Sequence, residues 1–379
     1  MEQVIGAFEI ASPALRKAAE AIAIGQSIGN PNVRLQNETD EMWERFGSHV
    51  LEIEPAGTSR ARVEISFPVG NFTTGNLTHL LTVVMGGQMD IDIIHECRLI
   101  DLKLPLSILS QYQGPRHGVA GIRSYLCAHD RPLVGGIVKP KTGVTPEKLR
   151  DVIVEMADGG IDFIKEDEIL GDIDYCPFDQ RVPMIVKALE PYKIIYAPCV
   201  ADSIARFDHV TRVLKDSGAV AFHYNFWGGL DAFKVLADKT GLFAFYQKSG
   251  DKVATTGKYS IDFAVWCTLL RLAGADFTHA GMIGGYMDEG PDVMKRRLHH
   301  LQGELNGTQA VMPSLSCGAH PGLVEKLAFM LGNDIMVSAG GFLHGHPGGT
   351  RAGAKAFRDA AEKRQSAELD AAVAKWGRG

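Results

Sequence analysis

The sequence predicts an α/β protein in which a small α+β domain (residues 1–115) precedes a (β/α)8 barrel (residues 116–379). Three observations lead to this prediction. From about residue 130 the chain repeats a short apolar strand, a polar or glycine-rich stop and a helix, and it does so eight times. Before residue 115, helix and strand patterns are mixed. Between the two regions, residues 111–121 combine glycine, proline and polar residues, as domain boundaries commonly do.

The N-terminal region contains signals for both helices and strands. Residues 14–24 have the apolar spacing of an amphipathic helix, and a second helix is expected to open near Asn76. Residues 61–67 alternate between apolar and polar side chains, which is typical of a half-buried strand, and another strand is expected over residues 91–101. This mixture predicts a small α+β domain.

The barrel is predicted from near-continuous apolar strands, because parallel strands are buried on both faces. Eight strand–helix units close such a barrel, and a doubly wound open sheet is the structural alternative. The helix after the first strand has a start signal in Thr145 and Pro146, and residues 352–376 predict one long alanine-rich helix. The strands with their end residues occupy 135–141, 162–168, 193–199, 219–225, 242–248, 276–281, 310–318 and 334–341.

Composition restricts the partners and the compartment. Lys and Arg total 39 against 45 Asp and Glu, so the net charge is −6, and the chain has no global field for nucleic acid or an anionic membrane. Six cysteines are scattered without a C-x-x-C pair, which indicates a reduced compartment. The N-terminus lacks the pattern of a signal peptide, and no apolar run reaches the roughly 20 residues of a membrane span. We therefore expect a cytoplasmic protein.

The predicted strands end in polar residues. In a barrel the C-terminal ends of the strands meet at one mouth, where barrel enzymes have their active sites. One polar strand end is ordinary, but most of these strands have one, so we expect a functional site at the mouth. In chain order the residues are Lys139, Lys141, Lys165, Glu166, Asp167, Glu168, Cys199, His223, Asn225, Gln247, Lys248, His279, Ser316, Gly340 and Gly341.

The end of the second predicted strand, with the sequence IKEDE, indicates a metal site. Strand periodicity puts Lys165 and Asp167 on one face, and Glu168 follows where the strand ends. Two carboxylates offer the hard oxygen ligands that suit Mg²⁺. An ammonium beside a cation would repel it, so Lys165 is expected to act as a neutral base or to carry CO2 as a carbamate. For this segment taken alone, a solvated run of salt bridges is the alternative.

Glycines follow the last strands of the predicted barrel. Gly340 and Gly341 follow the eighth strand, and a turn from Ser316 to Gly318 follows the seventh. Backbone N–H groups exposed by glycine beside a helix N-terminus bind phosphate, although tight turns use the same residues. His279 ends the sixth strand and is either a satisfied polar residue or a group that contacts substrate. Gly-x-Ser-x-Gly, P-loop and His-Glu-x-x-His motifs are missing from the sequence, so those hydrolase and nucleotide-hydrolysing classes have no support.

Several segments, taken in this order, resemble the large subunit of ribulose bisphosphate carboxylase (RuBisCO). The resemblance implies an N-terminal ferredoxin-like α+β domain, a C-terminal (β/α)8 barrel, and a homodimer or higher oligomer with active sites between subunits. The matching segments span most of the chain and are QGPRHG (113–118), IVKPKTG (137–143), GGIDFIKEDE (159–168), HAG (279–281), SCG (316–318) and AGGFLHGHPGG (339–349).

The resemblance also implies roles for individual residues. Lys165 would be a lysine carbamylated by CO2, and Asp167 and Glu168 would bind Mg²⁺ together with it. Lys139 and Lys141 would lie beside the substrate, with Lys139 as the proton-transfer residue. The residues expected to contact substrate hydroxyls or phosphate are Lys248, His279, Ser316, Gly318, Gly340 and Gly341.

Five positions depart from the pattern of carboxylases in this family. Tyr286 stands where a loop lysine grips CO2, and Gln247 and Lys248 replace a His–Arg pair that binds phosphate. Gly25 and Gly87 stand where the N-terminal domain lends a Glu and an Asn to the partner's site. These departures imply a RuBisCO-like protein (form IV) that does not fix CO2.

The resemblance therefore implies an enzyme that keeps the first half of the chemistry, in which a metal polarises a carbonyl and a base removes the neighbouring proton. We expect Mg²⁺-dependent enolisation or isomerisation of a small phosphorylated keto-sugar such as 5-methylthioribulose 1-phosphate. Decarboxylation of an oxo-sugar-acid phosphate, of the 3-oxo-isoapionate 4-phosphate type, is an alternative. A non-catalytic binder of phosphate esters is the alternative from another functional class.

Overall fold

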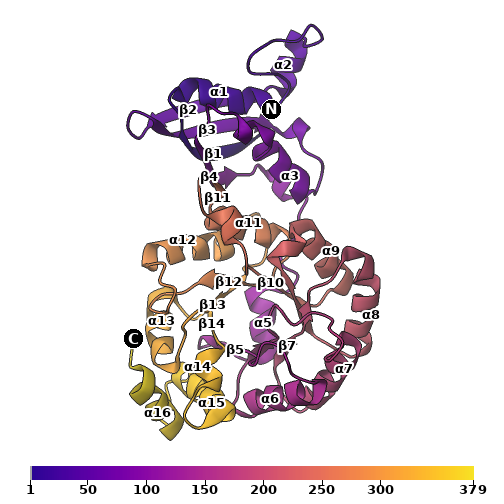
Figure 1. Cartoon of the computed structure of the whole chain (residues 1–379), viewed down its shortest axis with the longest axis vertical. Helices are drawn as coiled ribbons and strands as arrows, with labels where there is room; N and C mark the ends of the chain where they lie inside the picture. The colour runs from indigo at the N-terminus through magenta and orange to yellow at the C-terminus, as the bar shows by residue number, and fades with distance from the viewer. Residues whose placement is uncertain (1) are drawn as a thin grey trace. The chain divides into compact units, whose positions relative to one another are not determined.

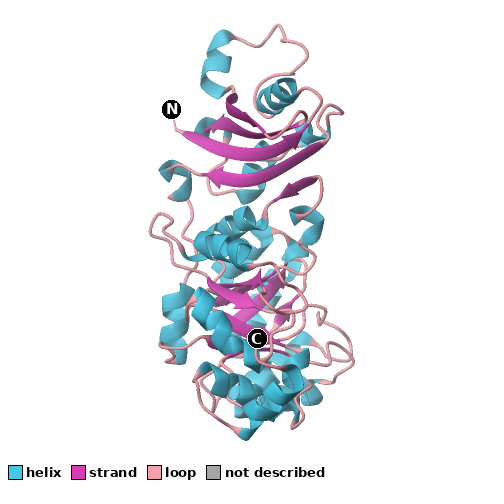
Figure 2. Ribbon diagram, turned by 90° about the vertical axis from the view of Figure 1, so that its left-hand side faces the viewer, coloured by secondary structure: helices cyan, strands magenta, loops and turns pink. Residues whose placement is uncertain are grey.

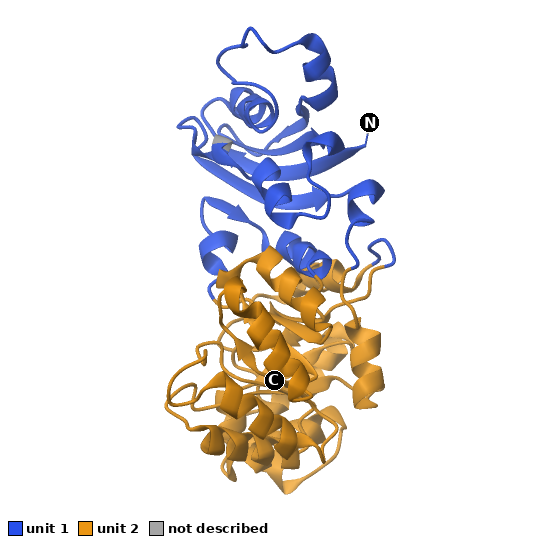
Figure 3. Ribbon diagram, turned by 90° about the vertical axis from the view of Figure 1, so that its right-hand side faces the viewer, with its two compact units in different colours: residues 1–113, 250–273, 304–307 blue, residues 114–249, 274–303, 308–379 orange. Residues whose placement is uncertain are grey.

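The computed structural model describes residues 2–379, apart from the side chain of residue 88, and divides the chain into two compact units. Figure 3 shows the first unit in blue (residues 1–113, 250–273 and 304–307) and the second in orange. The division after residue 113 falls inside the segment 111–121. Two later segments, 250–273 and 304–307, also belong to the first unit, whereas the sequence analysis placed them in the barrel.

The first unit is built on a sheet with the strand order β11-β4-β1-β3-β2. β1, β2, β3 and β4 pair antiparallel, and with two helices they follow the chain order β-α-β-β-α-β of a ferredoxin-like domain. The elements, labelled in Figure 1, are β1 (Gln3–Ala11), α1 (Leu15–Gly25), α2 (Asp40–Phe46), β2 (His49–Pro55), β3 (Arg60–Pro68), α3 (Leu77–Val84), β4 (Glu96–Lys103), α4 (Leu106–Leu109), α10 (Lys252–Thr255), β11 (Tyr259–Ile261) and α11 (Phe263–Leu272).

Local chemistry accounts for several of these elements. The Asn76 side chain accepts a hydrogen bond from the backbone N–H of His79, so it caps α3 at the position that the sequence predicts. In β3 buried side chains alternate with partly exposed ones from Ala61 to Ile65, as the sequence pattern predicts, and the last three residues are all buried. β11 comes from a segment far along the chain and pairs parallel with β4, which extends the sheet by an edge strand.

The second unit is a closed parallel barrel. Its sheet has the order β7-β6-β5-β14-β13-β12-β10-β9-β8, and β7 and β8 at the two ends are successive parts of one stretch of chain. Pro198 separates them because it has no N–H to donate to a ladder. The strands are β5 (Leu133–Ile137), β6 (Phe163–Lys165), β7 (Ile195–Ala197), β8 (Cys199–Val200), β9 (Ala221–Asn225), β10 (Phe243–Gln247), β12 (Phe277–Gly281), β13 (Met312–Leu315) and β14 (Met336–Ala339).

The (β/α)8 prediction is therefore confirmed over the described residues, and the open-sheet alternative is wrong. The ends of the sheet meet through the backbone at Pro198, whose carbonyl accepts a hydrogen bond from the N–H of His223 over 3.0 Å. Helices surround the strands (Figures 1 and 2). They are α5 (Gly118–Leu126), α6 (Pro146–Asp158), α7 (Phe178–Leu189), α8 (Phe207–Asp216), α9 (Leu230–Thr240), α12 (Pro291–Gln302), α13 (Val324–Leu331), α14 (Gly341–His344), α15 (Gly349–Ala361) and α16 (Ala367–Trp376).

The prediction of one long helix over residues 352–376 is wrong, because the segment forms two helices, α15 and α16. Lys363 has a φ of +56°, a left-handed conformation that ends a helix. Ser366 then accepts a hydrogen bond from the N–H of Leu369 and caps the next helix. Ser366 is the start signal of α16, but the alanine-rich sequence on both sides of it favoured the prediction of one continuous helix.

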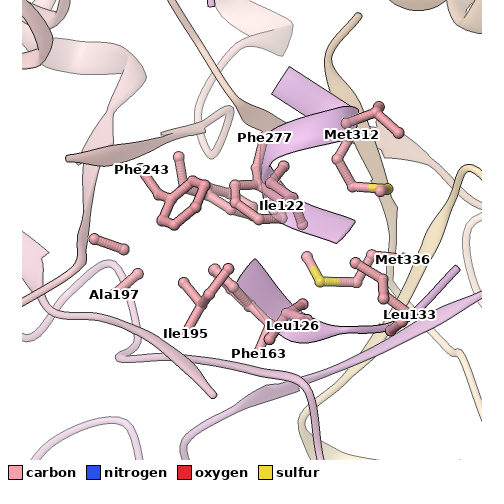
Figure 4. Close-up of a cluster of buried hydrophobic side chains, with 14 residues drawn as sticks. Ile122, Leu126, Leu133, Phe163, Ile195, Ala197, Phe243, Phe277, Met312 and Met336 are labelled. Atoms are coloured by element: carbon pink, nitrogen blue, oxygen red, sulfur yellow. The ribbon is translucent and has the colours of Figure 1, made fainter. Parts of the chain in front are cut away.

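The base of the barrel is filled by a cluster of apolar side chains that come from the strands and from α5 (Figure 4). Phe163, Phe245 and Phe277 lie in contact, with ring centroids 4.9 to 6.1 Å apart. Because side chains alternate along a strand, the residue two positions after each inward-facing one also points inward. Among the described residues, no helix is long and apolar enough to cross a membrane.

Candidate active site

A layer of polar side chains lies directly on the aromatic floor of the barrel. Lys165 stands two residues after Phe163, and His279 stands two residues after Phe277. Both contact the same ring: Nζ of Lys165 lies 5.9 Å from the centroid of Phe245, and the imidazole of His279 lies 4.9 Å from it. Because Lys165 shares a face of β6 with Phe163, strand periodicity places it at the bottom of the mouth.

Lys165 is an almost fully buried amine with few partners. Its side chain is 1% exposed, and Nζ donates a hydrogen bond over 3.0 Å to the backbone carbonyl of Glu166. Oε2 of Glu168 lies 3.5 Å from Nζ. Burial lowers the pKa of Lys165, and the negative charges of Glu168 and its neighbours only partly oppose that effect. The amine is therefore biased toward its neutral, nucleophilic form.

Asp167 points to the opposite side of the cluster, toward the lysines that follow β5. Nζ of Lys139 forms an ion pair and a hydrogen bond with Oδ2 of Asp167, and Nζ of Lys141 lies 4.0 Å from the same oxygen. A Cβ atom at Gly340 would lie 2.8 Å from Cε of Lys139, so the glycine leaves room for this lysine. Both lysines thus approach one carboxylate, which is itself only 2% exposed.

Glu168 completes the cluster and is held at both oxygens. Oε1 accepts a hydrogen bond from Oγ of Ser249 over 2.7 Å, while Oε2 faces Lys165. Burial alone would raise the pKa of Glu168, but the charge of Lys165 and the hydrogen bond from Ser249 outweigh it and lower the pKa to about 2. Glu168 is consequently a carboxylate across the physiological pH range.

Glu166, between the two inward-facing residues, points away from the mouth. It forms a buried ion pair with Arg181 of α7, with 3.0 Å between Nε and Oε1. Tyr196 donates its hydroxyl proton to the same carboxylate over 2.5 Å, and the N–H of Cys199 donates over 2.7 Å. Sequence reasoning did not find Arg181, because a lone arginine in a helix carries no sign that it faces the barrel wall.

His279 and Ser316 form a separate pair beside the cluster. Oγ of Ser316 and Nδ1 of His279 lie 3.1 Å apart within hydrogen-bonding geometry. Burial, followed by the positive charge of Lys165, lowers the pKa of His279 to about 3, so the ring is neutral at neutral pH. His223, one strand from Gln247, is fully buried and has no hydrogen-bond partner at either ring nitrogen within the described residues.

The remaining predicted residues surround this centre. Gly341 begins α14, and Gly318 has a φ of +108° at a point where its loop meets the backbone of Tyr286. Lys248 follows β10, and its charge acts on His279. Tyr286 is 78% exposed on the loop after β12. The charged centre thus gathers Lys139, Lys141, Lys165, Asp167 and Glu168, with the glycine loops at its edge.

The side chains of this centre would suit a divalent cation if Lys165 carried a carbamate. In residues 2–379, no group of three or more His, Cys, Asp and Glu side chains is arranged to hold a metal ion. Asp167 and Glu168 supply two carboxylates, of which Asp167 pairs with Nζ of Lys139 and Glu168 faces Nζ of Lys165. Conversion of the neutral Lys165 amine into a carbamate would add a negative charge and a third oxygen ligand. Three oxygen donors of this kind suit a divalent cation.

The fold and the site define a class of protein: a two-domain α/β-barrel chain with a lysine–carboxylate centre at the ends of its strands. The model of the ribulose bisphosphate carboxylase large chain, catalytic domain, matches residues 118–378, and the model of its N-terminal domain matches residues 2–108. The chain belongs to the RuBisCO large-chain family, whose members are enzymes.

Named relatives and solved structures cover almost the whole chain. The ribulose bisphosphate carboxylase of Archaeoglobus fulgidus is 29% identical over 420 residues, which cover 100% of this chain and 95% of the relative. The octameric RuBisCO of Pyrococcus horikoshii OT3 superposes with a TM-score of 0.93 at 26% identity and covers 99% and 93% of the two chains. A rubisco-like protein (MtnW) from Alicyclobacillus acidocaldarius gives 0.89 at 29% identity, with 99% and 100% covered.

Proposed function

We propose that this chain is a RuBisCO-like protein without carboxylase activity, which enolises or isomerises a phosphorylated keto-sugar in a Mg²⁺-dependent reaction. The proposed substrate is of the 5-methylthioribulose 1-phosphate type. One observation carries the proposal: a buried amine, Lys165, lies beside the carboxylate Glu168, and a second lysine, Lys139, is paired with the neighbouring carboxylate Asp167.

The buried amine supports the step that prepares the site. A carbamate forms when the lone pair of the neutral Lys165 amine attacks the carbon of CO2 and the nitrogen loses a proton. The lowered pKa of Lys165 favours the neutral amine that this addition needs. Carbamylated Lys165, Asp167 and Glu168 would then hold Mg²⁺. When bound there, the ion supplies Lewis-acid polarisation of a substrate carbonyl.

The side chains around this centre would divide the remaining work. Lys139, whose Nζ pairs with Asp167, would move the proton at the carbon next to the carbonyl. Neutral His279 would donate or accept a hydrogen bond at a substrate hydroxyl, in the orientation set by Ser316. Lys141, Lys248 and the backbone at Gly318, Gly340 and Gly341 would bind phosphate.

Relatives of this chain are named carboxylases, so the proposal has to account for the loss of CO2 fixation. Two residues argue against it in this chain. Tyr286 stands in the loop after β12 where the family pattern has a lysine, and a phenol carries no positive charge to hold CO2 or a carboxylate. Gln247 stands where the pattern has a histidine and donates to Ser249 instead. Fixation of labelled CO2 on ribulose 1,5-bisphosphate above background would overturn this part of the proposal.

Decarboxylation of an oxo-sugar-acid phosphate is the second candidate. It is favoured by Gly87, because this residue offers no side chain to act as a base from the N-terminal domain. Loss of CO2 from an oxo acid leaves its electron pair on the α carbon and forms an enolate without proton abstraction. The same centre would stabilise that negative charge.

Solvent-exchange NMR separates the candidates. The full chain, supplied with bicarbonate and Mg²⁺, is incubated in D2O with 5-methylthioribulose 1-phosphate and, separately, with an oxo-sugar-acid phosphate. Deuterium uptake next to the carbonyl of the keto-sugar supports the enolisation proposal, and CO2 release from the oxo acid alone supports the second candidate. Tight binding without exchange or CO2 release would mean a non-catalytic binder and would overturn both.

We also propose that the chain works in the cytoplasm as a homodimer or a larger assembly with active sites between subunits. The octameric Pyrococcus horikoshii relative supports an assembly. Light scattering of the purified chain tests it, and a monomeric mass at micromolar concentration would contradict it.

A further inference from the structure

Two polar residues at the end of β10, Gln247 and Ser249, form a short chain of hydrogen bonds that ends on Glu168. Nε2 of Gln247 donates to Oγ of Ser249 over 2.7 Å, and Oγ of Ser249 donates to Oε1 of Glu168 over 2.7 Å. Gln247 is 3% exposed, whereas Ser249 and Glu168 are partly buried. No step of the proposed reaction uses either residue.

The backbone of Ser249 is held as well as its side chain. Nδ2 of Asn225, at the end of the neighbouring strand β9, donates to the carbonyl of Ser249 over 3.3 Å. Asn225 and Gln247 are partners in the parallel ladder of β9 and β10. Two adjacent strands therefore fix the hydroxyl of Ser249 opposite the end of β6.

The charge of Glu168 sets the direction of both hydrogen bonds. A carboxylate only accepts, so Ser249 must give it its single hydroxyl proton. The Ser249 oxygen then accepts from Gln247, which must present its NH2 group rather than its carbonyl. In agreement with this orientation, Oε1 of Gln247 is buried without a hydrogen-bond partner in the described part of the chain. A glutamate at position 247 would lack this donor.

We propose that Gln247 and Ser249 are positioning residues that hold Glu168 for cation binding through Oε2. Ser249 donates a hydrogen bond to Oε1 of Glu168, while Oε2 faces Lys165, the residue proposed to become the carbamate. The inference rests on the proposed function, because it assumes that Lys165, Asp167 and Glu168 bind the cation. It gives β10, at whose end Gln247 departs from the carboxylase pattern, a role in orienting the metal ligand Glu168.

The test measures metal binding rather than turnover. Mn²⁺ is titrated into the full chain in the presence of bicarbonate, and bound Mn²⁺ is followed by electron paramagnetic resonance. Loss of an outer hydrogen bond to a metal ligand typically weakens affinity about 10- to 100-fold, and this is the loss expected for Ser249→Ala. Ser249→Thr keeps the hydroxyl and should restore most of the affinity and the wild-type spectrum.

A double variant shows whether Gln247 acts through Ser249. Gln247→Met removes the donor at similar length and should weaken Mn²⁺ binding. Combined with Ser249→Ala, it should add little, because both changes break the same chain of hydrogen bonds. Ser217→Ala is the matched control, since this hydroxyl donates to the carbonyl of Leu214 at a helix end, away from the strand ends. Circular dichroism and thermal unfolding verify that each variant is folded.

The outcomes separate this inference from the proposal beneath it. Wild-type affinity in folded Ser249→Ala, or strictly additive losses in the double variant, would overturn the positioning role and leave the cation site intact. If the wild-type chain binds no Mn²⁺, or if Glu168→Gln binds it as well as wild type does, the cation site of the proposed function is wrong, and the positioning role is wrong with it.

Discussion

Successive residues at the end of β6 send their charges to opposite sides of the barrel wall, and the two sides are built differently. On the outer side, Glu166 and Arg181 are both 0% exposed, and the carboxylate accepts from Tyr196 and a backbone N–H as well as from the arginine. On the inner side, buried Lys165 has one backbone carbonyl and one carboxylate at 3.5 Å.

This difference distinguishes charges that stabilise the fold from charges that are available for reaction. A buried ion pair with complete hydrogen bonding has one stable arrangement and leaves no lone pair or proton for another molecule. The inner amine of Lys165 has only these two weak partners in the described part of the chain, so it keeps a lone pair that can react with another molecule. We therefore expect changes on the inner side to alter chemistry, and changes on the outer side to alter stability.

The largest expected effect is on the inner side. Lys139→Met should lower turnover by roughly two to four decades, as is typical of a lost acid–base group, and leave substrate affinity within about tenfold. Single-turnover kinetics with the keto-sugar phosphate, together with direct binding measurements, check this. A variant that turns over normally, or that only raises KM, would make Lys139 a phosphate anchor and remove it from the chemistry.

The next effect is on the outer side. Arg181→Met leaves Glu166 as a buried carboxylate without its counter-charge, and should destabilise the barrel by about 3–5 kcal/mol. Urea denaturation followed by circular dichroism measures the loss. Adding Glu166→Gln removes the orphaned charge and should restore part of the stability. If Arg181→Met folds normally while turnover is abolished, the division between the two sides fails.

A smaller effect concerns His279 and pH. An unfolded histidine titrates near its ordinary pKa of 6.5, whereas the folded ring has a pKa of about 3. Between these values the unfolded chain binds the extra proton, so this residue makes the folded state less stable as the pH falls through that window. Nitrogen NMR of the imidazoles should show that the signal lost in His279→Gln belongs to a ring that stays neutral from pH 8 down to pH 4. Titration of that signal near pH 6.5 would contradict the burial argument.

The smallest effect provides a baseline for the comparison. Lys234 and Asp238 form an ion pair of 2.6 Å on the surface of α9, where the carboxylate is 63% exposed. Lys234→Met should change the free energy of unfolding by less than about 1 kcal/mol, because exposed pairs contribute little. A loss as large as that of Arg181→Met would show that short distance, rather than burial, governs these charges.

Much of the barrel could be predicted from sequence, because its signals are local. Each strand is a short apolar run with a polar end, and period two was enough to predict that Lys165 and Asp167 share one face. β2 was not predicted, because none of its residues is buried and its apolar alternation, from Leu51 to Glu54, covers only four residues. β11 escaped because it has only three residues and its partner β4 lies far away in the sequence.

The same limit applies to the site. The lysines and carboxylates were found because they stand at strand ends. The residues that form hydrogen bonds and ion pairs with the carboxylates lie in other segments of the chain. Ser249 follows β10, and Arg181 lies within α7. Neither position has a pattern of its own, since a serine in a loop and an arginine in a helix are ordinary surface residues. Only the closed barrel brings them to Glu168 and Glu166.

The strand β11 has a consequence for how this chain can be divided. A gene fragment that stops at residue 113 would encode the antiparallel part of the first sheet, but would omit the strand that covers the edge of β4. Such a fragment would expose unpaired backbone groups along that edge, which invites association with other strands. A barrel fragment that starts at residue 114 would in turn carry β11 and α11 without their sheet. Neither unit is an exchangeable module, so recombination at the apparent boundary would break both.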